Sequence, residues 1–187
     1  METGPMALAP DEAHLLRQTQ SGDDQAFELL YSRHQPPIYR YVLRMSGSEA
    51  VAEEVVQEVF LALIHGARGY DPSSGPLRSY LYGMARHALA RQRRDDWRFE
   101  ELNGDGHPFD ANPLEGLTRA QAVDRLRHAL AALPAHYREA VVFCEMEELS
   151  YADAAEILGV PVGTIRSRLN RARALLLERL SRQGVEA

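Results

Sequence analysis

The chain has 187 residues with no lysine and only one cysteine. The single cysteine, Cys144, excludes a disulfide within the chain and is typical of a protein in the reducing cytoplasm. No apolar run approaches the roughly 20 residues that cross a bilayer, so we expect no direct membrane insertion. Residues 1–10 lack the basic start and apolar run of a signal peptide, and we expect them to be disordered.

The sequence patterns of common enzymes are also absent. We find no HExxH pair, no phosphate-binding glycine loop and no nucleophile elbow. Asp124 and His128 stand one helical turn apart, but two ligands do not make a metal site. We therefore expect a protein that is not an enzyme and that binds neither a metal nor a cofactor.

Charge is distributed unevenly along the chain, whose net charge is −6. Residues 26–94 carry nine arginines against six acids, and residues 161–187 carry six arginines against two acids. Residues 95–120 between them carry seven acids and two arginines. Two basic blocks separated by acidic sequence predict two separate contacts with a polyanion.

The periodicity of apolar residues is helical throughout, and no strand alternation rises above noise. We predict an all-α fold of two small helical domains, at 11–94 and 118–187. Glycine, proline and clustered acids between them predict a flexible acidic linker at 95–117. Pro36-Pro37 is expected to separate two helices. The expected helices cover residues 11–19, 25–33, 38–45, 49–65, 77–94, 122–133 and 134–145, followed by two more near the C-terminus.

Those last two helices form the most specific local pattern. Ser150 is placed to cap the first of them, and Gly159 permits the positive φ of a tight turn. In the second, apolar residues recur every three or four positions from Ile165 to Leu180, and six of the residues between them are arginine or asparagine. This is a helix-turn-helix whose second helix is equipped for the DNA major groove.

Two earlier helices carry further candidate surfaces. Residues 77–94 mix arginines with Tyr80, Tyr82 and His87, a combination that suits unpaired bases and their phosphates. Ordinary core-edge tyrosines beside a solvated arginine face explain the same pattern. Residues 49–65 carry glutamates and Leu61 on the face opposite a valine-rich one, which suits either a partner bearing arginine or plain solvent.

Together these segments resemble the extracytoplasmic-function (ECF) class of RNA polymerase sigma factors. Glu53–Phe60 is similar to the polymerase-binding helix of region 2, and Arg78–His87 to its promoter-melting helix. Leu133–Glu139 and the helix-turn-helix are similar to region 4. Two positions depart from the family pattern, because Tyr80 stands where tryptophan is usual and His87 where asparagine is usual.

The resemblance implies a factor that directs core RNA polymerase to specific promoters and assists their melting. Its partners would be core polymerase, promoter DNA and an anti-sigma factor. Contacts to the upstream (−35) element would come from Arg166, Ser167, Arg168, Asn170, Arg171 and Arg173. Contacts to the downstream (−10) element would come from Tyr70, Arg78, Tyr80, Arg86 and His87. Polymerase would be held by Glu53, Glu54, Gln57, Glu58 and Leu61.

Two other classes share part of this pattern. A sigma-like decoy, which sequesters an anti-sigma factor without binding DNA, would have the same fold but no need for the six arginines of residues 161–187. A simple helix-turn-helix repressor would account for the second domain and leave the first unexplained. The acidic linker fits a basic channel in the polymerase and fits an inert tether equally well.

Overall fold

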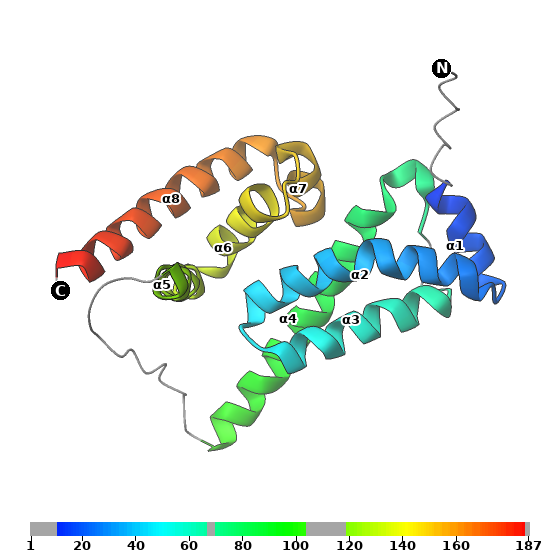
Figure 1. Cartoon of the computed structure of the whole chain (residues 1–187), viewed down its shortest axis with the longest axis horizontal. Helices are drawn as coiled ribbons and strands as arrows, with labels where there is room; N and C mark the ends of the chain where they lie inside the picture. Colours follow the sequence, from blue (N-terminus) through cyan, green and yellow to red (C-terminus); the bar gives the residue numbers. More distant parts are fainter. Residues whose placement is uncertain (1–10, 67–69, 104–118, 186–187) are drawn as a thin grey trace.

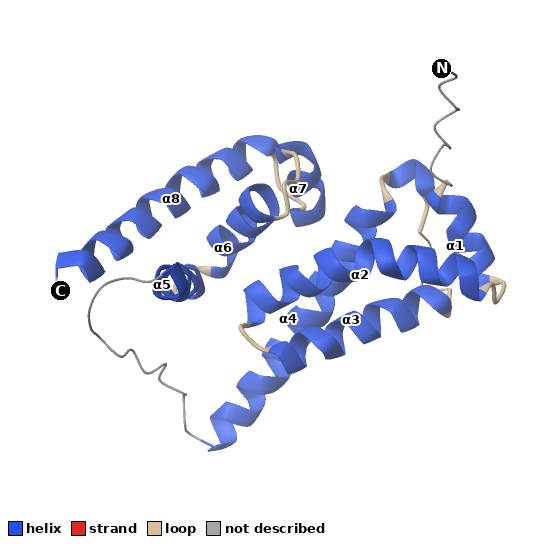
Figure 2. Cartoon of the chain, viewed as in Figure 1, coloured by secondary structure: helices blue, strands red, loops and turns tan. Residues whose placement is uncertain are grey.

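The computed structural model describes residues 11–66, 70–103 and 119–185, and within these ranges every regular element is helical (Figure 2). The predicted all-α fold is therefore confirmed for the part of the chain that the structure describes. The expected N-terminal disorder and most of the expected linker lie outside it. The elements in chain order are α1 (Glu12–Gln20), α2 (Asp24–Ser46), α3 (Glu49–Ile64), the short 3₁₀ helix η1 (Pro72–Ser74), α4 (Leu77–Asn103), α5 (Arg119–Ala131), α6 (Ala135–Val141), the π-helical turn η2 (Val142–Met146), α7 (Tyr151–Leu158) and α8 (Val162–Val185).

The helices form two lobes that lie side by side (Figure 1). Helices α1 to α4 make the first lobe, in which α2 packs against α1, α3 and α4. Helices α5 to α8 make the second lobe, in which α6 and α7 both pack against α8. Helix α7 lies against α4, whereas α8 runs along the side of the second lobe away from the first. The second lobe thus meets the first through α5, α6, η2 and α7.

The expected break at Pro36-Pro37 is wrong, because α2 continues through both prolines from Asp24 to Ser46. Each proline leaves a carbonyl one turn earlier without its helical donor. Those carbonyls belong to Ser32 and Arg33, whose exposed positions let water replace the missing donors. Core packing on both sides of the prolines holds the helix together, through buried Leu30, His34, Ile38, Tyr41, Val42 and Met45.

Side-chain caps fix where the first three helices begin. The Asp23 carboxylate accepts hydrogen bonds from the backbone N–H groups of Gln25 and Ala26, at 2.9 and 3.1 Å. Ser48 accepts from Val51 N–H at 3.4 Å, directly after Gly47 has ended α2 with φ of 76°. The helix predicted at 49–65 is confirmed within one residue as α3. Its valine-rich face is buried, and its glutamates face outward.

Helix α4 extends nine residues beyond the predicted end at Arg94, to Asn103. The sequence places residues 95–103 in the predicted linker because glycines and prolines follow them closely. The first of those breakers is Gly104, and the residues before it include several good helix formers. The predicted end of this helix at Arg94 is therefore wrong, whereas residues 104–117 lie outside the described residues.

The helix predicted at 134–145 is present as two different pieces. Helix α6 is α-helical, and the chain then widens into the π-helical turn η2. Glu147 N–H donates to the carbonyl of Val142 at 2.9 Å, five residues back instead of four. The wider turn ends in a non-helical residue at Glu147. Phe143 of this turn and Glu147 directly after it both contact the first lobe. The change of helix type is therefore part of the contact between lobes.

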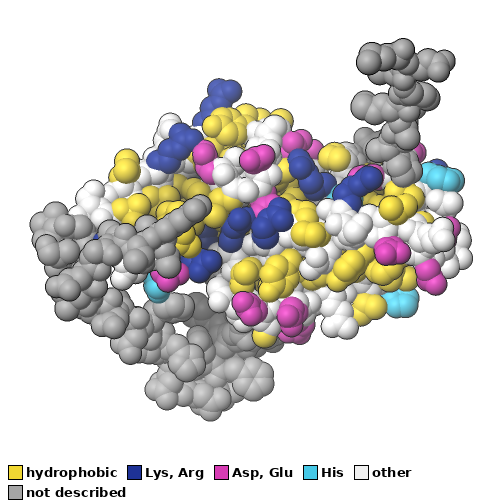
Figure 3. Space-filling view, in the orientation of Figure 1, with side chains coloured by type: hydrophobic (Ala, Val, Ile, Leu, Met, Phe, Trp, Pro, Cys, Tyr) yellow, Lys and Arg dark blue, Asp and Glu magenta, His cyan; other side chains and the backbone are white. Residues whose placement is uncertain are grey.

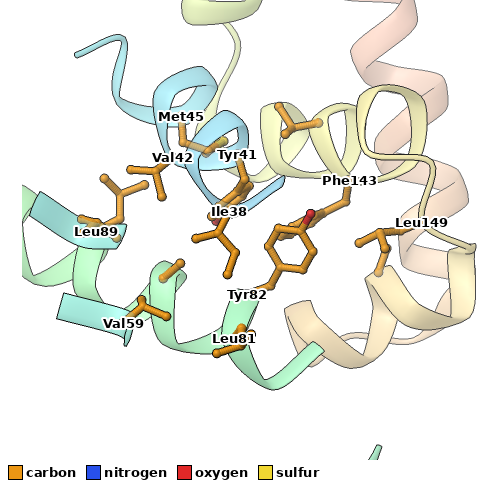
Figure 4. Packing of buried hydrophobic residues seen from close by; sticks show 14 of the residues in the cluster. Ile38, Tyr41, Val42, Met45, Val59, Leu81, Tyr82, Leu89, Phe143 and Leu149 are labelled. Carbon is orange, nitrogen blue, oxygen red and sulfur yellow. The ribbon is translucent and has the colours of Figure 1, made fainter. Parts of the chain in front are cut away.

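One hydrophobic core runs through both lobes (Figure 4). Phe143 of the second lobe stacks on Tyr41 of α2, with ring centroids 4.7 Å apart and planes within 10°. The same ring meets the edge of Tyr82 of α4 at 5.1 Å. Tyr82 is fully buried, and this burial raises the pKa of its phenol, with the Glu147 carboxylate acting in the same direction. The arrangement of the two lobes, which the sequence left open, is therefore a packed one.

A buried histidine makes the stability of the first lobe depend on pH. His34 is 4% exposed, and its Nε2 lies 3.1 Å from the Glu12 carboxylate of α1. Burial lowers the pKa of His34 below its ordinary value, and Glu12 opposes this only in part. The unfolded chain therefore binds a proton at a higher pH than the folded chain does. The contribution of His34 to the free energy of unfolding is therefore complete above about pH 6.5 and decreases as the pH drops below that value.

We expect the melting temperature to fall between about pH 7.5 and pH 5.5, and to fall less in His34→Gln, which cannot titrate. Thermal unfolding followed by circular dichroism at both pH values measures the difference. His14→Gln is the matched control, because His14 is exposed on α1. Equal pH slopes in the His34 variant and the native chain would show that this imidazole does not couple to folding.

Candidate nucleic-acid interface

The helix-turn-helix predicted near the C-terminus is formed by α7 and α8. Ser150 Oγ accepts from Asp153 N–H at 3.1 Å, which caps α7 as expected. Gly159 ends α7 with φ of 63°, a left-handed conformation that favours glycine. Ala154, Ala155 and Leu158 of α7 are buried, as are Ile165, Leu169 and Ala172 of α8. Local capping and a shared apolar seam thus fix the angle at which α8 leaves the turn.

Four of the predicted upstream-element residues share the outer surface of α8. Each residue turns the helix by about 100°, so Arg166, Ser167, Asn170 and Arg171 fall within about 140° of one another on the side opposite Ile165 and Leu169. All four are exposed. Arginine, asparagine and serine are side chains that read base edges or hold phosphates in the major groove. Figure 3 shows arginine side chains projecting from this edge of the molecule.

The other two predicted residues of α8 lie at the borders of that surface. Arg168 is half-buried, on the side that turns toward the core. Arg173 forms an ion pair with Glu145 of η2, and this hydrogen bond raises the pKa of the Arg173 guanidinium. Arg173 is therefore neutralised within the lobe, whereas Arg166 and Arg171 present exposed head groups.

The predicted downstream-element residues separate into two groups in the structure. Tyr70 and Tyr80 lie together, with ring centroids 5.4 Å apart, and the Tyr70 hydroxyl donates to the carbonyl of Gly75 at 3.1 Å. Burial raises the pKa of Tyr70, which keeps this donor protonated. His87 is exposed two turns further along the same side of α4 as Tyr80. These three residues make one aromatic surface at the start of α4.

Arg78 and Arg86 face the second lobe instead. Arg86 Nε lies 3.0 Å from the Glu139 carboxylate of α6, and Arg78 Nη2 lies 3.7 Å from the Asp153 carboxylate of α7. Both arginines keep over a third of their side-chain surface exposed. The structure therefore does not bring them together with the tyrosines, although all five residues belong to one segment of sequence.

The predicted polymerase-binding residues lie along the outer face of α3. Glu53, Glu54 and Gln57 are exposed, and Leu61 is 47% exposed. Glu58 differs from the others, because it forms an ion pair with Arg91 of α4. These five residues therefore form a polar strip with one exposed apolar side chain, Leu61. One of its acids, Glu58, is already paired with an arginine of the first lobe.

Beside this strip lies an aromatic groove of about 440 Å³ that the sequence reasoning missed. Glu53, Gln57 and Leu61 border it from α3, and Phe27, Tyr31 and Tyr39 line it from α2. Tyr31 meets the edge of Phe60 at 4.8 Å, which holds the rings in place. The residues at 27, 31, 35 and 39 repeat every four positions, a signal of one helix face. The predicted break at Pro36-Pro37 places these residues on two separate helices, so the sequence analysis does not join them into one helix face.

Other kinds of site find no support in the structure. The described residues contain no group of three or more side chains able to hold a metal ion. Within the same residues, no helix is both long and apolar enough to cross a bilayer. Cys144 is half-buried, and burial raises the pKa of its thiol, as expected of an inert cysteine.

Comparison with known proteins identifies both lobes. The family profile described as Sigma-70 region 2 matches residues 30–99, and the profile described as Sigma-70, region 4 matches residues 124–176. The RNA polymerase sigma-H factor of Pseudomonas aeruginosa is 31% identical over 182 residues, which cover 90% of this chain and 93% of that protein. The ECF RNA polymerase sigma factor SigL of Mycobacterium tuberculosis is 34% identical, with 83% and 89% covered.

The chain belongs to the ECF class of RNA polymerase sigma factors. As a sigma factor it directs RNA polymerase to promoters, and it is not itself an enzyme. The region 2 profile falls on the first lobe and the region 4 profile on the second. The function that the sequence predicted is therefore confirmed.

Two solved structures share this fold. CnrH, in a structure with the cytosolic domain of CnrY, is 27% identical with a TM-score of 0.67, and the match covers 91% of this chain and 97% of that one. The sigma factor RpoE of Bartonella quintana, in a structure with the anti-sigma factor NepR, is 26% identical with a TM-score of 0.69, with 84% and 98% covered. The fold of this sigma factor is thus shared along nearly its whole length.

Proposed function

We propose that the outer face of α8 reads the upstream promoter element in the major groove. The observation that carries this role is the set of exposed polar side chains at Arg166, Ser167, Asn170 and Arg171, aimed away from the lobe by the buried seam behind them. Arg166 and Arg171 would contact guanine or the flanking phosphates. Arg168 and Arg173, at the borders of the surface, would contact phosphates, and Arg173 would first leave Glu145.

The downstream element would be held by the loop before α4 and the start of that helix. Tyr70, Tyr80 and His87 offer rings to unstacked bases of the melted strand, and stacking at about 1–3 kcal/mol per base offsets much of the cost of unpairing. Arg78 and Arg86 would hold the phosphates beside those bases. Their exposed head groups support this role, although each contacts a carboxylate of the second lobe here.

Core polymerase would bind the strip on α3 together with the aromatic groove. The strip is Glu53, Glu54, Gln57, Glu58 and Leu61. Charged side chains bordering a concave aromatic surface are typical of a protein interface, in which a few buried anchors carry most of the affinity. Leu61 and Tyr31 are the exposed apolar residues best placed to be such anchors.

The partner that restrains this sigma factor would be an anti-sigma protein. CnrH and RpoE, whose folds it shares, were solved with CnrY and with the anti-sigma factor NepR. We infer a working domain division at 11–94 and 118–187, with residues 95–117 joining the two, and a place in the cytoplasm beside the polymerase. A decoy that binds only an anti-sigma protein is the alternative, and the exposed arginines of α8 argue against it.

Run-off transcription tests the assignment directly. Bacterial core polymerase is supplied with a library of promoter fragments, with and without this protein. We expect defined start sites that appear only when the protein is present, with two shared sequence elements upstream of them. An absence of new starts, together with stable binding to an anti-sigma protein, would favour the decoy.

The role of α8 predicts the effect of single arginine substitutions. Arg166→Ala or Arg171→Ala should weaken binding to the upstream element by about 1–3 kcal/mol, which is roughly 5- to 150-fold, without lowering the melting temperature. Arg179→Ala is the matched control, because Arg179 is exposed on the same helix beyond the proposed contact surface. Unchanged promoter binding by holoenzyme carrying either variant would remove that arginine from the interface.

The role of α3 predicts that a charge at the apolar anchor blocks polymerase binding. Leu61→Glu should weaken binding to core polymerase at least about tenfold, because a carboxylate would be buried without a partner. Leu177→Glu is the matched control, since Leu177 is 66% exposed on α8 and lies outside the strip. Titration of labelled protein with core polymerase measures both. An equal loss in the two variants would point to a general defect instead of a lost contact.

A further inference from the structure

Four arginines of region 2 contact carboxylates of region 4, and we call them the bridging arginines: Arg40, Arg44, Arg78 and Arg86. Arg40 binds Glu147 with two hydrogen bonds, Nη2 to Oε2 at 2.8 Å and Nε to Oε1 at 3.1 Å. Arg44 binds the same carboxylate. Arg86 and Arg78 pair with Glu139 and Asp153, as described above. We call Glu139, Glu147 and Asp153 the bridging carboxylates.

Exposure differs between the two sides of these ion pairs. The side chain of Glu147 is 2% exposed and that of Glu139 is 12% exposed, so these two carboxylates are largely sealed inside the contact. The bridging arginines keep between 28% and 48% of their side chains exposed. The arginines therefore form an accessible basic strip across α2 and α4, and region 4 supplies the anions that cover part of it.

Three of the four arginines lie near one buried side chain. Tyr82 lies close enough to Arg40, Arg44 and Arg78 for each of the three charges to act on its phenol. Arg86 stands on the same helix as Arg78, two turns further along. Figure 3 shows arginine and acidic side chains together along the border between the two lobes on this face.

The contact that covers the strip also contains apolar packing. Phe143 is completely buried between Tyr41 and Tyr82, and the Arg138 guanidinium donates to the carbonyl of Met45 across the border at 2.9 Å. The carboxylate of Glu156 of α7 lies against Gly75. Region 4 therefore sits firmly on α4 and on the end of the loop before it, where the downstream element is proposed to bind.

A guanidinium binds a carboxylate and a phosphate through the same two-pronged geometry. We propose that region 4 competes with promoter DNA inside this chain: its bridging carboxylates occupy a basic strip that holds the phosphates of the melted strand once the lobes separate. Arg40 and Arg44 of α2 thereby join Arg78 and Arg86 as phosphate-binding residues. This inference rests on the proposed role of α4 at the downstream element.

Neutralising the bridging carboxylates should leave the bridging arginines free to bind the phosphates of single-stranded DNA. The test uses the full chain without polymerase and a fluorescein-labelled oligothymidylate of about 20 nucleotides, so that the result does not depend on a promoter sequence. We expect Glu139→Gln/Glu147→Gln to bind this probe at least about tenfold more tightly than the native chain at moderate salt. Its radius of gyration in small-angle X-ray scattering should also rise as the lobes separate.

Two further variants show whether the strip itself accounts for the gain. Glu28→Gln/Glu148→Gln removes the same charge from exposed positions outside these ion pairs and should bind like the native chain. Adding Arg40→Gln/Arg44→Gln to the carboxylate variant should abolish most of the gain. Native affinity in the carboxylate variant, or a gain that survives the loss of both arginines, would overturn the proposal.

Holoenzyme provides a second measurement that does not need the carboxylate variant to fold. The lobes must separate there for α4 to reach DNA, so Arg40→Gln/Arg44→Gln should lower the slope of promoter affinity against salt by about one to two, one for each lost phosphate contact. An unchanged slope would overturn the proposal as well. Run-off transcription by the native protein keeps the two hypotheses apart, because start sites there support the sigma role whatever the oligonucleotide result.

Discussion

The pairing of Glu147 with two arginines is the interaction on which the arrangement of the lobes depends. A carboxylate that is 2% exposed must have partners, because a buried charge without them costs several kcal/mol. Three features supply the pairing. The π-helical turn carries Glu147 to the border, α2 continues through its prolines to present Arg40 and Arg44 one turn apart, and Phe143 packs on Tyr41 beside them. Losing any one of these would leave the carboxylate without its partners.

The same arrangement divides the functional surfaces into two sets. The outer face of α8 and the groove beside α3 stay open while the lobes are together, because neither faces the border. Arg78 and Arg86 of α4 are instead paired with carboxylates of the second lobe. With the roles proposed above, the chain would meet polymerase and duplex DNA before the lobes separate and free these arginines for the melted strand. Order of contact then follows from geometry, with no added domain.

Much of this could be predicted from the sequence where the signals are local. Ser150 and Gly159 stand at the two ends of α7, and their caps need no distant partner. The continuity of α2 could not be predicted, because it depends on burial by three other helices. The pairing of Arg40 with Glu147 could not either, since the residues stand 107 positions apart. Arg78 and Arg86 were expected on phosphate and are found on carboxylates, which sequence cannot distinguish because both anions suit a guanidinium.

The π-helical turn gives this fold a simple way to change during evolution. A π turn contains one residue more than the α-helical turn it replaces, and such a residue arises by a single-codon insertion. One residue changes the direction of the following side chains by about 100°, enough to decide whether a carboxylate or a neutral side chain faces α2. Descendants that lose this codon would keep α8, the helix proposed to read DNA, and lose the attachment between lobes. A few mutational steps could therefore replace the attachment of the second lobe within this chain by attachment through a separate protein.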